Sequence, residues 1–255
     1  VFWRRASARI TDDGHAHAKA GALPPNTDAT LGVAALASEA KGATTLDVRF
    51  VPGAEPVHAH AGYWRLGDGT LRATQAGDDT GGKPLLAPRA YVGKRYFSSD
   101  QLAVEIQLSL RPLEADFPVE AGAQRFGELS FRVKDLQISV LAIPDVGMRM
   151  GWRYFRKDGR LVVGNSSADV AEGYEEEAPF PGFNKPFQVR LGLKRVVDGV
   201  EVEGQINGAV FFRRQLPGLE GQSAKIALGC RNLHCDFNSL RVRGLASKRG
   251  LGNPR

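Results

Sequence analysis

Four of the five histidines fall in two H-x-H pairs, His15/His17 and His58/His60. Alternate residues of an extended strand share one face, so both imidazoles of a pair could ligate one metal ion. If the two pairs met in space, they would form a four-histidine site suited to Zn²⁺. Exposed loop histidines beside small alanines are the competing interpretation, and under it the chain needs no cofactor.

Two acidic runs could also do chemistry. Glu114, Asp116 and Glu120 are candidate catalytic residues, since retaining cleavage of a glycosidic bond needs two carboxyl groups about 5–5.5 Å apart. Pro118 would interrupt the strand that presents them, which favours an acidic loop instead. The run Glu175–Glu177 is expected to be a solvated loop, with coordination of a structural Ca²⁺ as the alternative.

A set of aromatic and basic residues is the best candidate for ligand binding. Sugars bind by stacking on aromatic rings and by hydrogen bonds to planar side chains, and arginine offers a two-pronged contact for carboxylate or sulfate. The competing interpretation puts the aromatic residues in the core and leaves the basic ones as a solubilising surface. The candidate ligand-binding residues are Trp152, Tyr154, Arg149, Arg153, Arg190 and Lys194.

The only two cysteines, Cys230 and Cys235, lie in one short segment. This spacing predicts a local disulfide that closes a hairpin, and a disulfide implies an oxidising compartment. Two free thiols in the core are the alternative. A zinc site is less favoured, because only His234 adds a nearby ligand.

The elements that must position these groups are strands. Apolar residues recur at every second position in several runs, which predicts strands with one buried and one wet face. Asp-Gly and Asn-Gly dipeptides between runs supply the positive φ angles of tight hairpins. The runs lie around residues 46–50, 104–110, 187–193, 200–202 and 240–242, and the turn signals are at 67–69, 158–159, 198–199 and 207–208. The pattern predicts an all-β fold, an antiparallel β-sandwich.

Several of these segments resemble concanavalin-A-like lectin/glucanase domains, in the style of laminin-G-like domains and the bacterial 3-keto-disaccharide hydrolase type. The resemblance rests on a W-x-x-x-D-G-x-L hairpin at Tyr63–Ala73 and on later strand and turn motifs. These later motifs are Phe187–Leu191, Val202–Gly208, Gly221–Leu228 and Asp236–Val242. The resemblance implies a jelly-roll fold. It leaves the function open, because this fold hosts lectins, hydrolases and adhesion modules.

The chain divides by composition into three parts. Residues 1–43 are expected to form a tether or edge segment with a short helix within 29–41. Residues 44–246 would form the sandwich, and residues 247–255 a basic tail. Val1-Phe2-Trp3-Arg4-Arg5 is typical of the end of a membrane segment, which suggests an upstream anchor.

The net charge of +6 favours an anionic partner or surface. The sequence carries no basic helix, zinc finger or RNA-binding signature, so nucleic acid is not an expected partner. These features predict a non-catalytic extracytoplasmic module, periplasmic or at the cell surface, that binds a glycan or a protein partner and is membrane-tethered or part of a membrane-associated assembly. The alternatives are a glycoside hydrolase-like enzyme and a structural subunit of a larger complex.

Overall fold

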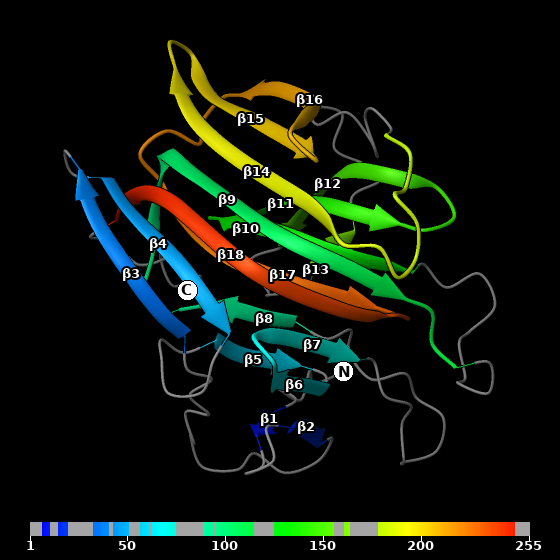
Figure 1. Cartoon of the computed structure of the whole chain (residues 1–255). Helices are drawn as coiled ribbons and strands as arrows, with labels where there is room; N and C mark the ends of the chain where they lie inside the picture. The colour runs from blue at the N-terminus through cyan, green and yellow to red at the C-terminus, as the bar shows by residue number, and fades with distance from the viewer. Residues whose placement is uncertain are drawn as a thin grey trace.

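The computed structural model describes residues 7–10, 15–19, 33–40, 43–50, 57–61, 63–74, 89–93, 95–114, 125–155, 161–163 and 178–247. Every regular element in these ranges is a strand, and every strand pairing is antiparallel. The strands form two layers (Figure 1). The all-β antiparallel sandwich predicted from the sequence is therefore confirmed.

The first layer is built around β9 (Phe97–Arg111) and β18 (His234–Ala246). Beyond β9 follow β14 (Phe187–Val196), β15 (Gly199–Ile206) and the outermost β16 (Ala209–Leu216). On its other edge, β18 pairs with β7 (Thr70–Thr74) along its first half and with β4 (Ala43–Phe50) along its second. The remaining strands extend these two branches: β3 (Val33–Ala40) beside β4, and β6 (Tyr63–Gly67), β2 (His15–Lys19) and β1 (Ser7–Ile10) outward from β7.

The second layer has β17 (Ser223–Arg231) near its middle. On one side β17 pairs with β8 (Arg89–Val92), which pairs with β5 (Val57–Ala61). On the other side lie β10 (Phe126–Val133), β11 (Leu136–Ile143), β12 (Gly147–Phe155) and β13 (Leu161–Val163). The start of β9 also pairs with β17 at Ser98 and Phe97, so one strand joins the hydrogen-bonded ladders of the two layers.

The core lies between the layers, because alternate residues of each strand point inward. Trp152 of β12 packs against Phe212 of β16, with ring centroids 5.7 Å apart. A Cβ added at Gly127 of β10 would lie 2.7 Å from Leu110 of β9, which shows how closely the layers approach there. Most of the apolar residues predicted to point inward are fully buried, among them Val104, Ile106, Leu108, Leu110, Val189, Leu191, Leu193, Val200, Val202, Leu240 and Val242.

Three of the four predicted hairpin turns lie within the described residues. Asp68 joins β6 to β7 with φ 52°, and Asn207 and Gly208 join β15 to β16 with φ 48° and 82°. Gly199, with φ 152°, begins β15 after the turn from β14. The Asp158-Gly159 turn lies outside the described residues.

The expected helix within 29–41 does not form, because Val33–Ala40 is strand β3. Alanine is a strong helix former, but β3 pairs with β4 along its whole length, from Val33 with Phe50 to Ala40 with Ala43. Tertiary pairing thus overrides the local preference.

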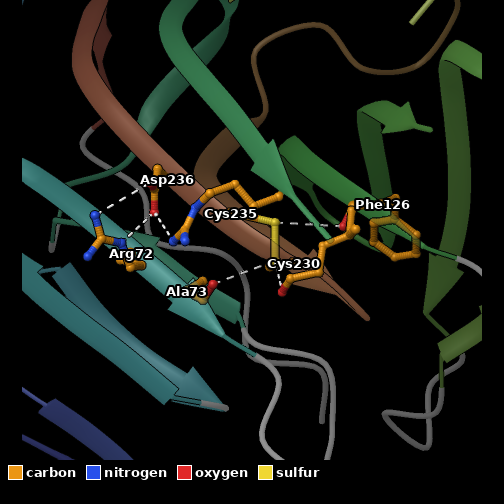
Figure 2. Close-up of a disulfide and its surroundings, with 8 residues drawn as sticks. Arg72, Ala73, Phe126, Cys230, Cys235 and Asp236 are labelled. Carbon is orange, nitrogen blue, oxygen red and sulfur yellow. Dashed lines mark hydrogen bonds and ion pairs between the residues drawn. A yellow bond between two sulfur atoms is a disulfide. The ribbon is translucent and has the colours of Figure 1, made fainter. Parts of the chain in front are cut away.

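Cys230 and Cys235 form the predicted disulfide, and both are completely buried. The predicted hairpin around it is wrong. Cys230 belongs to β17, which pairs with strands of the second layer, whereas Cys235 belongs to β18 in the first layer. The bond crosses the turn from one layer to the other, and Figure 2 shows it beside Ala73 and Phe126.

Candidate functional site

The outer face of the first layer carries a polar surface. Where β18, β9, β14, β15 and β16 lie side by side, a groove of about 840 Å³ opens between their outward-pointing side chains. Most of the residues that line the groove are polar or charged. These residues are Asp100, Gln101, Arg190, Lys194, Glu201, Glu203, Arg213 and Arg243, with Leu102, Ala103, Gly192 and Leu193 beneath them.

The groove exists because the middle of its floor carries almost no side chain. Gly192 of β14 lies directly opposite Ala103 of β9. A Cβ added at Gly192 would have no atom nearer than 3.9 Å, so the space above it is open. The larger side chains at Arg190 and Lys194, two residues to either side, form the groove's rims.

A hydrogen-bonded cluster forms one wall. The Glu203 carboxylate accepts hydrogen bonds from Arg190 at 2.8 Å, from Gln205 at 2.6 Å and from Arg213 at 2.5 and 3.1 Å. Strand register explains the convergence, since Glu203 is paired with Arg213 on β16 and its neighbour Gln205 with Arg190 on β14. The planar groups of three side chains are thus held around one carboxylate.

The cluster holds Glu203 ionised. Partial burial alone would raise the pKa of Glu203, but the hydrogen bonds from Arg213 and Gln205 and the charge of Arg190 outweigh it and lower the pKa below 4.5. The same contact raises the pKa of Arg213. The wall is therefore a fixed arrangement of charges at neutral pH.

Two further cations face the groove across its floor. Lys194 is paired with Gln101, and Arg243 with Ala103, on opposite sides of β9. Within the described residues, no carboxylate forms an ion pair with either of them. Both charges are therefore available to an acidic group lying on the floor.

A second cavity, of about 630 Å³, lies toward the other end of β18 on the same face. The register of β18 against β9 shifts between Asn238 and Arg241, and this irregularity turns Ser239 toward the cavity lining. Asp236 in the lining pairs with Arg72 at 2.7 Å and with Arg111 at 3.6 Å. The Arg72 contact is drawn in Figure 2.

Of the three catalytic candidates, only Glu114 lies in the described part of the chain. Glu114 lies 3.1 Å from Nε2 of His234, and its pKa is lowered by a backbone hydrogen bond and by the contact with His234. Asp116 and Glu120 lie outside the described residues, as does the run 175–177.

The candidate ligand-binding residues are divided between the layers. Arg190 and Lys194 line the groove of the first layer. Trp152 is buried in the core, and Arg149 lies on the outer face of the second layer. The backbone of Arg153 and Tyr154 continues β12, while their side chains lie outside the described set.

The candidate metal ligands lie on two separate strands. His15 and His17 are in β2, and His58 and His60 are in β5. Their side chains are not among those described, so the metal site remains a prediction. Among the side chains that are described, no group of three His, Cys, Asp or Glu residues could hold a metal ion.

Sequence reasoning missed most of the groove. Glu203, Arg213 and Arg243 are recognisable in the sequence only as polar positions on alternating strands, and Gly192 as a glycine at a polar position of its strand. What assembles them is the order of β18, β9, β14, β15 and β16 in the sheet, and this order is not encoded in any single strand. The glycine on the polar side of a strand was the one local signal.

No family model and no curated protein matches the chain. Among solved structures, it is similar to the carbohydrate-binding module CBM66 from Bacillus subtilis, with 10% identity over 72% of this chain and 94% of that one and a TM-score of 0.48. It is also similar to the Emp46p carbohydrate recognition domain, with 12% identity over 73% of this chain and 86% of that one and a TM-score of 0.45. A third similar structure is alginate lyase Aly36B, with 9% identity over 80% of this chain and 98% of that one and a TM-score of 0.49.

Proposed function

We propose that the chain is an extracytoplasmic binding module that holds an acidic glycan in the groove over Gly192. One observation supports this most directly. An open floor of glycine and alanine is bordered by rigidly held planar side chains and by two cations, Lys194 and Arg243. Sugar hydroxyls need fixed donors and acceptors, and a uronate or sulfate group needs a cation.

The Glu203 cluster supports binding through its rigidity. Arg190, Gln205 and Arg213 are already ordered around the carboxylate, so a ligand would not have to fix them on arrival. This ordering reduces the entropic cost of association.

Binding fits the carboxylates of Glu203, Glu114 and Asp236 better than hydrolysis does. A general acid for glycoside cleavage needs a raised pKa, so that it is protonated when it meets the substrate. The pKa values of Glu203 and Glu114 are both lowered, and Asp236 is paired with two arginines. Each of these groups is suited to holding a charge, not to delivering a proton.

The proposed compartment follows from the buried disulfide, because such bonds persist in oxidising environments. Within the described residues there is no helix with the length and apolar character needed to cross a bilayer. The upstream anchor suggested by Val1–Arg5 and a place in a membrane-associated assembly remain part of the proposal.

The decisive variant is Gly192→Gln. It places a side chain in the groove, and the open space around the added Cβ should leave the fold intact. The control is Val197→Gln, in which a 97% exposed residue in the β14–β15 turn is changed outside the groove. Binding to uronate-containing, sulfated and neutral oligosaccharides would be measured by calorimetry, with thermal denaturation to verify folding.

We expect wild type and Val197→Gln to bind an acidic oligosaccharide, and Gly192→Gln to bind it at least about tenfold more weakly, because the floor is blocked. Lys194→Met and Arg243→Met should weaken binding of acidic more than of neutral ligands. Equal binding by Gly192→Gln and wild type would overturn the groove as the site. If no oligosaccharide binds, the proposal that the ligand is a glycan is overturned, and a protein partner becomes the candidate ligand.

A further inference from the structure

The second cavity on the outer face of the first layer differs chemically from the groove. It has a volume of about 630 Å³ and lies beside the first half of β18. Carboxylates, amides and hydroxyls make up most of its lining. No arginine or lysine is among the described residues that line it, whereas four of them line the groove. The polar residues of the lining are Asp68, Gln107, Ser109, Asp236, Asn238 and Ser239.

The cavity lies where β18 changes its partner strand. Asn238 is paired with Thr70 of β7, whereas Leu240 is paired with Val48 of β4. Ser239, between them, has no partner residue in either register. The sheet is therefore interrupted at this point, and the hollow opens between β9, the β6–β7 turn and the irregular part of β18.

Several hydrogen-bonding groups in the cavity are available to a ligand. Oδ1 of Asn238 accepts a hydrogen bond from the Thr70 hydroxyl, which leaves the two N–H donors of that amide for a ligand. No described residue forms a hydrogen bond with the side chain of Gln107, Ser109 or Ser239. Amides and hydroxyls both donate and accept, so this set suits a ligand rich in hydroxyl groups.

The charges of the cavity disfavour an anionic ligand. The two arginines nearest to Asp236 are already bound to its carboxylate, Arg72 at 2.7 Å (Figure 2) and Arg111 at 3.6 Å. The exposed carboxylate of Asp68 forms no ion pair with a described cation. A uronate or sulfate group in this cavity would be repelled by Asp68. An uncharged sugar meets no such repulsion, and its hydroxyls can donate to the carboxylates.

The cavity and the groove lie on one line along the sheet. Ala103 of the groove floor and Gln107 of the cavity both point outward from β9, four positions apart, which corresponds to about 13 Å along the strand. Glu105 lies between them, opposite Arg190 of β14, and accepts a hydrogen bond from Gln188. The surface that joins the two hollows is therefore polar as well, and a short oligosaccharide chain is long enough to reach across it.

We propose that this cavity binds a sugar without a negative charge, and that this sugar belongs to the same glycan whose acidic residue lies in the groove over Gly192. The inference rests on the proposed function and names its ligand more closely, as a glycan that contains both acidic and uncharged sugars. Gln107, Ser109 and Asn238 bind the hydroxyls of the uncharged sugar.

The test compares two oligosaccharides of equal length by calorimetry. In the mixed chain, a hyaluronan oligosaccharide, glucuronate alternates with an uncharged N-acetylated sugar. In the uronate chain, an oligogalacturonate, every residue carries a carboxylate. Gln107→Ala removes hydrogen-bonding groups from the cavity, and Ser109→Gln fills it. The matched control is Gln215→Ala, because Gln215 is an exposed glutamine of β16 that lines neither hollow.

We expect wild type to bind the mixed chain more tightly than the uronate chain. Gln107→Ala and Ser109→Gln should each bind the mixed chain about tenfold more weakly, as for the loss of one or two hydrogen bonds, and bind the uronate chain as wild type does. Gln215→Ala should match wild type with both chains. Unchanged affinity of Gln107→Ala and Ser109→Gln for the mixed chain would overturn the proposal, as would an equal loss for both chains. Thermal denaturation verifies that each variant is folded, and Gln107→Ala changes only an exposed side chain.

Gly192→Gln separates this inference from the proposed function. It should weaken binding of both chains, because the groove holds a uronate of each. If it weakens both while the cavity variants weaken neither, the groove remains the site and the cavity proposal is overturned. If it weakens neither while the cavity variants weaken the mixed chain, the groove is overturned, and the cavity binds a sugar that is not part of a glycan in the groove.

Discussion

Cys230 and Cys235 lie in different layers of the sandwich, although they are only five positions apart in the chain. Their bond closes a loop centred on Asn232, which adopts a positive φ of 52°. Both sulfur atoms are buried between the layers, beside backbone carbonyls of Ala73 and Phe126. The crosslink thus fixes the point at which the chain passes from one layer to the other.

Opening this crosslink should destabilise the fold modestly. For so short a loop, the entropy restored to the unfolded chain corresponds to about 2 kcal/mol. Wild type in reducing buffer should lose that amount of unfolding free energy in urea titrations. Cys230→Ala/Cys235→Ala should be destabilised in either buffer and indifferent to reductant. No difference between oxidised and reduced wild type would contradict the structural role of the bond.

Gly127 should tolerate no side chain. A Cβ there would lie 2.7 Å from Leu110 and 3.1 Å from Leu108, across the closest approach of the layers. Gly127→Val is expected to cost about 1–3 kcal/mol through overpacking. Gly67→Val is the matched control, since a Cβ at Gly67 meets no atom within 4 Å. Chemical denaturation measures both, and equal stabilities would show that the layers can separate at this point.

Ser139 should matter more than Ser130, although both are buried serines on the outer face of the second layer. Ser139 donates a 2.5 Å hydrogen bond to the buried Glu128 carboxylate, whereas the Ser130 hydroxyl lies 3.4 Å from the carbonyl oxygen of Ala227. Ser139→Ala is expected to lose about 1.5–3 kcal/mol, as for a hydrogen bond to a charged group. Ser130→Ala should lose clearly less in the same denaturation experiment, and the reverse order would refute this assignment.

Glu203 should make stability depend on pH in the acid range. Its pKa in the folded chain is below the ordinary 4.5, so the unfolded chain binds the proton more readily. The carboxylate therefore stabilises the fold above 4.5 and loses this effect as the pH falls through the lowered pKa. Because the partners are partly exposed, we expect only about 0.5–1 kcal/mol.

The experiment compares Glu203→Gln with Glu220→Gln. The second variant is the control, because Glu220 is a carboxylate without a described ion pair. Glu203→Gln should be less stable than wild type at neutral pH, and the difference should shrink at pH values below the lowered pKa. Glu220→Gln should follow wild type throughout. A deficit of Glu203→Gln that is constant across the acid range would contradict an ionised, paired Glu203.

Local patterns predicted the strands well where one face is apolar and the other polar. The alternation from Val104 to Leu110 predicted the buried face of β9, and Asn207-Gly208 predicted a hairpin turn. The pattern fails in β11, where every residue from Leu136 to Ile143 is buried. There Gln137 and Ser139 are covered despite being polar, because their hydrogen bonds to Glu128 satisfy them.

The candidate site was less predictable, because it depends on which strands are neighbours. Arg190 and Lys194 were recognised as outward-facing, but nothing in their own segment places Arg213 or Arg243 beside them. The opposite error occurred at Trp152, where an aromatic residue suited to sugar stacking is part of the core. An alternating pattern gives two faces without saying which one is covered by the other layer.

The course of β9 has a kinetic consequence. Its first residues complete the ladder of β17, and the rest of the strand lies between β18 and β14, from distant parts of the chain. Neither layer can complete its strand pairing before β9 is in place. Folding therefore depends on contacts between residues far apart in sequence and should be slow. For the same reason the layers should melt together in a single transition.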